Sequence, residues 1–294
     1  MNDKLWNGPE TGDPQPIIYS GGLLSKGGGT VEADVVKRSR LRYACLSYFY
    51  INSFGRTEAG ENVLKALRQL GTRCFLDSGA YSYHVYAEKR KIQLTKKEAA
   101  KFIDGYAEWV KTSGFAFDFI VTFDYERDPD IVLWANKLLE EKHGLHPVPV
   151  YHKGTSITAL RKLIDRGYSL IGIGGLLPYH EGNIRHFLDH VFNVTERHSV
   201  RCHGFGMGGQ IMLDYPWFSV DSSSPVQVAK RGDVFRTSLD PRKVYDVVPV
   251  SSRSTAVRSG RKDCREDRIV DNLQLIDGLM DLKRPPVRFK KGLF

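Results

Sequence analysis

Three aspartates of this sequence directly follow short apolar runs, a position that suits a reactive carboxylate. They are Asp77, Asp124 and Asp221. We expect residues 218–220 to form a short buried strand, with Asp221 at its tip and serines beginning a turn after it. The strand would hold the backbone while the loop leaves the oxygens open to a ligand, as a nucleophile requires. Alternatively, Asp221 caps a helix that starts near Pro225, because Asp and Ser are preferred at helix N-caps.

The residues at the other strand ends suit substitution at a glycosidic bond. One carboxylate could attack an anomeric carbon and form a covalent intermediate, while a second carboxyl group transfers protons to and from the exchanged groups. A third carboxylate, with backbone amides exposed by glycines, could bind the N–H groups of guanine, and Tyr81 and Phe205 could sandwich its ring. The strand-end set comprises Asp77, Asp124, His152, Gly174, Gly175, Phe205, Gly206 and Asp221.

Strand and helix patterns alternate through most of the chain. Strands are predicted at 43–51, 73–76, 117–123, 147–151, 169–173, 201–204 and 218–220, with a weaker candidate at 234–237. Helices are predicted at 57–70, 95–111 (with a Thr-Lys-Lys-Glu capping box), 128–142, 156–166, 181–196 and 268–282. This alternation favours an α/β fold, a closed (β/α)8 TIM-like barrel. The rival is an open doubly wound sheet; no GxGxxG follows the first strand, which weakens its dinucleotide-binding form.

We therefore expect three parts. Residues 1–42 form an N-terminal extension, as a loop or hairpin, and residues 43–250 form the catalytic barrel. Residues 251–294 form a basic loop, a C-terminal helix and a tail. In such a barrel the ligand site lies at the C-terminal ends of the strands, so the strand-end residues would face one pocket.

The charge of the chain favours a polyanionic partner. The formal net charge is +9, and nucleic acid is the first candidate for the partner. Alternatively, the positive charge serves only to keep the protein soluble. From Arg253 to the end there are 11 Lys and Arg against 6 Asp and Glu. The residues predicted to contact phosphates are Lys37, Arg38, Arg40, Arg258, Arg261, Lys262, Arg288, Lys290 and Lys291.

The location and cofactor predictions rest on missing signals. No apolar stretch approaches the roughly 20 residues of a membrane span, and the start lacks the order of a signal peptide, so we expect a cytosolic protein without membrane contact. Four cysteines, Cys45, Cys74, Cys202 and Cys264, lie far apart without a CxxC pair. We expect no zinc site and no other cofactor, and the first three cysteines read as buried apolar residues.

Six segments, in this order along the chain, resemble the motifs of the tRNA-guanine transglycosylases. The ordered set is more specific than any single motif. The segments are Phe75-Leu-Asp-Ser-Gly-Ala-Tyr81, Val121-Thr-Phe-Asp-Tyr125, Val148-Pro-Val-Tyr-His-Lys-Gly154, Ile171-Gly-Ile-Gly-Gly-Leu176, His203-Gly-Phe-Gly-Met-Gly208 and Phe218-Ser-Val-Asp-Ser222.

The resemblance implies a role for each matching residue. Asp221 is similar to the nucleophile of the family, Asp77 to the general acid/base and Asp124 to the residue that reads the base edge. His152 replaces a glutamine; it either bonds a substituent of the base or is structural. The remaining substrate-binding positions implied are Ser78, Tyr81, Gly174, Gly175, Phe205 and Gly206.

Two departures from the family refine these expectations. The clustered cysteines and histidine of its zinc site are absent, so no metal is carried over. The chain is also compact, and it resembles most the relatives from bacteriophages and bacterial DNA-modification clusters that insert 7-deazaguanine bases into DNA. We therefore expect DNA and a free preQ0-like 7-deazaguanine as substrates. The alternatives are the same exchange on tRNA, a hydrolase that leaves an abasic site, and a non-catalytic nucleic-acid-binding barrel.

Overall fold

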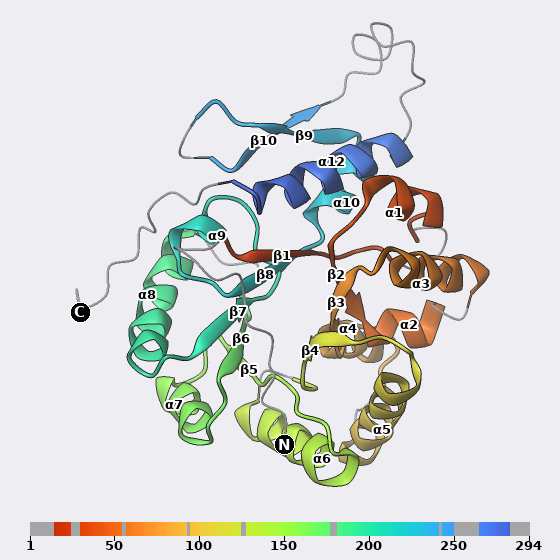
Figure 1. The fold of residues 1–294 in the computed structure, drawn as a ribbon. Helices are drawn as coiled ribbons and strands as arrows, with labels where there is room; N and C mark the ends of the chain where they lie inside the picture. The colour runs from red at the N-terminus through yellow and green to blue at the C-terminus, as the bar shows by residue number, and fades with distance from the viewer. Residues whose placement is uncertain are drawn as a thin grey trace, which may run out of the picture.

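Within the described residues, the computed structural model is a (β/α)8 TIM-like barrel, as predicted. It describes residues 15–24, 30–54, 57–92, 95–124, 128–176, 181–240, 243–249 and 265–282. Eight parallel strands form one curled sheet with helices around its outside (Figure 1), in the order β4, β3, β2, β1, β8, β7, β6, β5. These strands are β1 (Ile17–Ser20), β2 (Tyr43–Ser47), β3 (Arg73–Asp77), β4 (Phe117–Ile120), β5 (Val150–His152), β6 (Leu170–Gly174), β7 (Arg201–Gly204) and β8 (Ser219–Ser222).

The two edges of the curled sheet meet just beyond β4 and just before β5. Val121 and Val148 form a parallel bridge there. Thr122 N–H donates to the Val148 carbonyl at 3.0 Å, and Val148 N–H donates to the Ile120 carbonyl at 2.7 Å. This short contact closes the ring of strands, so the carboxyl ends of all eight strands surround one opening.

The helices begin where the sequence supplies capping side chains. Thr57 caps α3, Asp128 caps α6 and Ser156 caps α7, each accepting a backbone N–H, and Thr95 with Glu98 forms the predicted capping box of α5. The helices are α1 (Ala33–Ser39), α2 (Tyr48–Phe54), α3 (Glu58–Leu70), α4 (Ala80–Lys89), α5 (Lys96–Thr112), α6 (Pro129–His143), α7 (Ile157–Asp165), α8 (Glu181–Arg197), α9 (Ile211–Asp214), α10 (Ser224–Arg231) and α12 (Arg265–Leu279).

The interior of the barrel is filled by aromatic rings. Tyr19 lies edge-on to Phe75 at 4.9 Å between ring centroids, and Phe75 stacks on Phe119 at 4.8 Å. The Tyr19 hydroxyl donates to Asp118 at 2.6 Å, and Arg73 forms an ion pair with the same carboxylate at 2.7 Å. This packed and fully paired layer supports the residues at the strand ends above it.

The barrel begins earlier than the sequence predicts. The predicted N-terminal extension of residues 1–42 contains strand β1, which pairs with β8 from Ile17–Ser219 to Ser20–Ser222, and helix α1. The weak candidate at 234–237 is a strand, but it does not belong to the barrel. It forms β9 (Asp233–Thr237), which pairs antiparallel with β10 (Tyr245–Pro249). Strand β1, and not 234–237, is therefore the eighth strand of the barrel.

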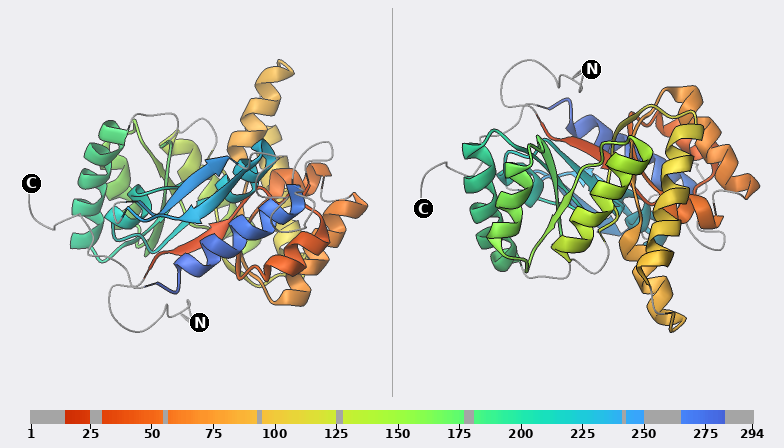
Figure 2. Two further views of the ribbon diagram at one scale, coloured as in Figure 1. Left: turned by 90° about the horizontal axis from the view of Figure 1, so that it is seen from above. Right: turned by 90° about the horizontal axis from the view of Figure 1, so that it is seen from below.

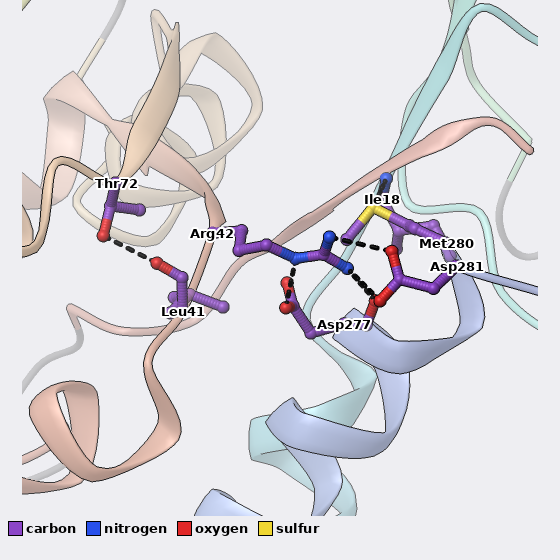
Figure 3. Close-up of polar contacts among 7 residues, drawn as sticks. All are labelled: Ile18, Leu41, Arg42, Thr72, Asp277, Met280 and Asp281. Atoms are coloured by element: carbon purple, nitrogen blue, oxygen red, sulfur yellow. Dashed lines mark hydrogen bonds and ion pairs between the residues drawn. The ribbon is translucent and has the colours of Figure 1, made fainter. Parts of the chain in front are cut away.

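Helix α12 packs across α1, α10 and β9 and is fastened at its C-terminal end. Arg42, just before β2, donates from Nε to Asp277 at 2.5 Å and from Nη1 to Asp281 at 2.9 Å (Figure 3). Ile18 N–H of β1 contacts the Met280 sulfur at 3.2 Å. Because these partners lie near the amino ends of β1 and β2, α12 ends at the face of the barrel opposite the strand ends.

The predicted C-terminal helix is present, but its own charge is acidic. Its segment Arg265 to Leu279 carries 2 arginines against 4 Asp and Glu. The basic character predicted for this part of the chain belongs to residues that flank the helix. The predicted phosphate contacts among them lie outside the described residues: Arg258, Arg261, Lys262, Arg288, Lys290 and Lys291. Among the helices that the structure describes, none has both the length and the apolar composition needed to cross a bilayer.

Candidate active site

Most of the predicted strand-end residues line one pocket of about 730 Å³ at the carboxyl ends of the strands. The convergence follows from the parallel sheet: Asp77 ends β3, His152 ends β5 and Gly174 ends β6, so the three residues lie at the same opening. The predicted residues in the lining are Asp77, Tyr81, Asp124, His152, Gly174, Gly175, Phe205 and Gly206.

Asp77 is a carboxyl group that holds its proton at neutral pH. Burial, followed by the negative charges of Asp124 and Asp221, raises its pKa to about 8, while backbone hydrogen bonds from Gly79 and Ser78 oppose the shift. Gly79 adopts a positive φ of 75°, and a Cβ there would lie 2.5 Å from Phe49 Cβ, so the turn that presents these N–H groups requires glycine. The arrangement gives the pocket a proton donor beside two carboxylates.

Asp221 lies immediately behind the pocket wall. Its Oδ1 accepts a hydrogen bond from Gly206 N–H at 3.0 Å, and its side chain keeps 15% of its exposure. Asp221 is not part of the pocket lining itself, which the Phe205–Gly206 turn forms in front of it. The φ of Gly206 is +64°, a conformation that side-chain-bearing residues rarely adopt. This turn therefore places Asp221 next to the pocket lining.

A buried histidine that the sequence reasoning did not single out supports Asp221 from the barrel interior. His203 Nε2 lies 3.6 Å from Asp221 Oδ1, and its Nδ1 is 2.8 Å from the Ser219 hydroxyl. Burial lowers the pKa of His203, although the carboxylate of Asp221 opposes this. If the Ser219 hydroxyl donates to Nδ1, the neutral ring carries its proton on Nε2 and directs it at Asp221. The alternation of strand residues in β7 and β8 could have indicated this pair.

Asp124 and His152 form a hydrogen-bonded pair in the pocket. His152 Nε2 lies 2.8 Å from Asp124 Oδ2. The other ring nitrogen, Nδ1, is buried without a hydrogen-bond partner among the described residues. A Cβ on Gly174 would approach that nitrogen to 2.9 Å. The His152 ring therefore fits beside residue 174 because glycine has no Cβ, and the ring orients Asp124. A role of His152 in bonding a substituent of the base stays a prediction.

The two aromatic residues predicted to hold a base differ in environment. Phe205 packs edge-on against His203 at 4.7 Å between ring centroids, and a Cβ on Gly172 would collide with its ring. Tyr81 lies on α4 with 75% of its surface exposed. One wall of the pocket is thus a fixed ring, and the other carries an open ring that has room to accommodate a ligand.

Ser78 does not take the predicted position against a ligand. The residue is fully buried, outside the pocket lining, and its hydroxyl accepts a hydrogen bond from Ala80 N–H at 3.4 Å. It therefore stabilises the turn into α4. The lining also includes Ala80, His84, Val85, Glu88 and Leu176. The sequence reasoning missed His84, Val85 and Glu88 because it predicted no helix at 80–89.

The described cations predicted to hold nucleic acid lie away from this pocket. Lys37, Arg38 and Arg40 line a hollow between α1 and α12. Arg38 is paired with Asp267 and lies 3.7 Å from Asp34. Arg40 precedes β2, so the five residues of that strand, roughly 16 Å, separate it from the strand ends. These cations therefore lie toward the amino ends of the strands, on the other face of the barrel from the pocket.

The chain lacks the features of a zinc site in its described part. No group of three or more His, Cys, Asp or Glu there is arranged to hold a metal ion. Cys74 and Cys202 are buried as predicted, and burial raises the pKa of each thiol to about 12. Cys74 lies on β3 and Cys202 on β7, two strands that are not neighbours in the sheet. These described cysteines therefore do not form the clustered set of the resembled family's zinc site.

The fold and this site define a (β/α)8 barrel protein with a carboxylate-lined pocket at the C-terminal face of its strands. Neither the family models nor the curated proteins searched gave a match to this chain.

Proposed function

We propose that the protein is a glycosyltransferase that exchanges guanine in DNA for a 7-deazaguanine base through a covalent aspartyl–DNA intermediate. The observation that carries the proposal is the grouping of Asp77, Asp124 and Asp221, in which Asp77 keeps a proton beside the other two carboxylates. A nucleophile and a proton donor from different strands of one barrel form the pair that substitution with retained configuration needs.

Asp221 and Asp77 divide the chemistry between them. A carboxylate oxygen of Asp221 attacks C1′ of the target deoxyguanosine, and the C1′–N9 bond breaks with its electron pair moving to the base. Asp77 donates its proton to the departing guanine. In the second half, the incoming base passes a proton to the Asp77 carboxylate, its N9 attacks C1′, and Asp221 is released.

Asp124 would select the base. One of its oxygens is engaged by His152, which fixes the plane of the carboxylate and leaves the other oxygen for the N–H groups of a guanine-like edge. Gly174 and Gly175 would present backbone groups at the same level, and Phe205 and Tyr81 would hold the ring. Guanine and 7-deazaguanine share this edge, so a single pocket serves both the leaving and the entering base.

The test is base exchange and adduct formation with purified protein. DNA and radiolabelled guanine should yield labelled DNA, and denaturing gels should show a protein–DNA adduct. Asp221→Asn should abolish both without loss of folding. Asp165→Asn, an exposed carboxylate at the end of α7, is the matched control and should behave like the unaltered protein.

The same assay separates the alternatives. If label enters tRNA but not DNA, the substrate polymer is tRNA instead of DNA. If abasic sites form without incorporation of label, the protein is a hydrolase. An Asp221→Asn variant that still forms the adduct would refute the assignment of the nucleophile. Absence of exchange, adduct and abasic sites with both polymers would leave a non-catalytic nucleic-acid-binding barrel.

A further inference from the structure

A second hollow, rich in aromatic rings, adjoins the active-site pocket. It lies between α2, α4 and the beginning of α5 and has a volume of about 1050 Å³. Tyr81 and Val85 line both hollows, so the two hollows are neighbours at this part of α4. Figure 2 shows the α4–α5 part of the chain standing out from the barrel on the side away from the C-terminal end of α12. We call this hollow the α4 groove.

The rings of the α4 groove form a layered floor with open faces above it. Tyr83 stacks on Phe102 at 4.5 Å between ring centroids, and Phe49 lies 5.9 Å from Tyr86. Tyr86 is 40% exposed, and Tyr81, at the junction with the pocket, is 75% exposed. Large exposed rings beside a pocket are costly in water and are typical of surfaces that stack on a ligand.

Cations border these rings. Lys89, Arg90 and Lys101 are exposed members of the groove lining, and the Arg90 guanidinium lies over the Tyr86 ring at 5.0 Å from its centroid. Glu98 is the acidic member of the lining, and its carboxylate is occupied by the Thr95 backbone N–H at 2.9 Å and the Thr95 hydroxyl. The groove therefore combines stacking faces with a positive edge.

We infer that the α4 groove binds the single-stranded DNA that flanks the nucleotide seated in the pocket, with bases stacked on Tyr81 and Tyr86 and phosphates at Lys89, Arg90 and Lys101. The inference rests on the proposed function for the identity of the polymer. A base reaches a barrel pocket either from single-stranded DNA or by extrusion from a duplex stack, which costs a few kcal/mol, and single-stranded flanks avoid that cost. Unpaired bases stack on exposed aromatic rings irrespective of sequence, and the adjacent phosphates bind Lys and Arg.

The test compares two charge variants of identical composition. Lys89→Gln with Arg90→Gln removes one lysine and one arginine from the α4 groove, and Lys37→Gln with Arg40→Gln removes the same pair from the opposite end of the barrel. Binding of a fluorescent single-stranded oligonucleotide is measured by anisotropy at several salt concentrations. The groove variant should flatten the slope of log affinity against log salt by about 1.4, at about 0.7 per lost phosphate contact, and the control should keep the original slope.

A ring variant tests the stacking separately. Tyr86→Ala should weaken single-stranded DNA binding about fivefold or more, whereas Tyr86→Phe, which keeps the ring, should bind like the original protein. Calorimetry with free 7-deazaguanine should give an unchanged affinity for all of these variants, because the groove lies beside the base pocket rather than in it.

The outcomes separate the inference from the proposed function. Equal salt slopes for the two charge variants, or a flatter slope for the control alone, would overturn the groove assignment while leaving base exchange intact. Groove variants that lose affinity for a tRNA stem-loop but not for DNA would overturn DNA as the occupant. Loss of DNA binding in groove variants of a protein that shows no base exchange would support the groove and refute the enzyme.

Discussion

Replacing Asp77 by asparagine should stabilise the protein at neutral pH while removing its chemistry. The pKa of Asp77 is about 8 in the folded chain, against 3.8 for the unperturbed group. Between these values the unfolded chain has released the proton and the folded chain still holds it. In the unaltered protein, Asp77 therefore does not lower the free energy of unfolding below about pH 4. As pH rises from there to about 8, the free energy of unfolding decreases.

The size of the stability loss follows from the pH interval between the unperturbed pKa of Asp77 and pH 7. Each pH unit costs about 1.4 kcal/mol, so the loss accumulated from 3.8 to pH 7 is at most roughly 4 kcal/mol. Asparagine cannot ionise, and its side-chain oxygen can still accept hydrogen bonds from Gly79 and Ser78, so Asp77→Asn avoids this loss.

Urea denaturation from pH 4 to pH 8.5 measures the difference. Asp77→Asn and the unaltered protein should have similar free energies of unfolding at pH 4 and diverge as pH rises. Asp104→Asn is a control of opposite sign, because hydrogen bonds from Lys142 and His143 lower the pKa of Asp104; this variant should be the less stable one at pH 7, and because Asp104 takes up its proton only below about pH 4, its deficit should stay nearly constant over this range. A difference between Asp77→Asn and the unaltered protein that does not grow with pH would refute the protonated state of Asp77.

The same variant links stability to turnover. Without its proton donor, Asp77→Asn should slow base exchange by about 10²–10⁴-fold while keeping its affinity for DNA. In the unaltered protein, formation of the covalent adduct should fall as pH rises through about 8, because the proton needed by the departing base is lost there. Near-normal exchange by the variant would assign the proton transfer to another group.

Two further predictions concern the recognition of the base. Asp124→Ala should weaken the binding of free 7-deazaguanine by roughly 1–3 kcal/mol, because the base edge loses its carboxylate partner, and should change DNA affinity less; equal losses in calorimetry and anisotropy would contradict this. Gly174→Ala places a Cβ 2.8 Å from His152 Cε1 and should displace that ring from Asp124, so it should mimic Asp124→Ala in base binding. Gly278→Ala, with nothing within 4 Å of its Cβ and no positive φ, is the control and should leave base binding unchanged.

Local signals in the sequence were sufficient to predict most helices and strands of the barrel. Capping side chains such as Thr57 and Thr95 fix helix starts through hydrogen bonds within one turn, and apolar runs ending in a polar residue mark the strands. Once the strands are parallel, their last residues must share one face. This is why Asp77 and Asp124 were predicted to face one pocket before any contact was known.

Some helices and strands depended on contacts that local patterns do not encode. The run from Tyr43 to Ile51 reads as one strand, but the chain turns into α2 after Ser47. The sequence predicts a loop or hairpin for residues 1–42, yet Ile17 to Ser20 becomes a barrel strand through its hydrogen bonds to β8 and β2. A short segment becomes a strand only when neighbouring strands offer it partners, which its own residues do not reveal.

The tertiary structure also decided the environment of each charge. The sequence placed Lys37 and Arg40 near the first predicted strand, but the direction of that strand puts them at the face opposite the pocket, and α4 brings Lys89 and Arg90 to the pocket side instead. The raised pKa of Asp77 has the same origin, because it depends on burial and on carboxylates from other strands. Composition fixes how many charges a chain carries, whereas their energies depend on distances and solvent exposure that exist only in the folded molecule.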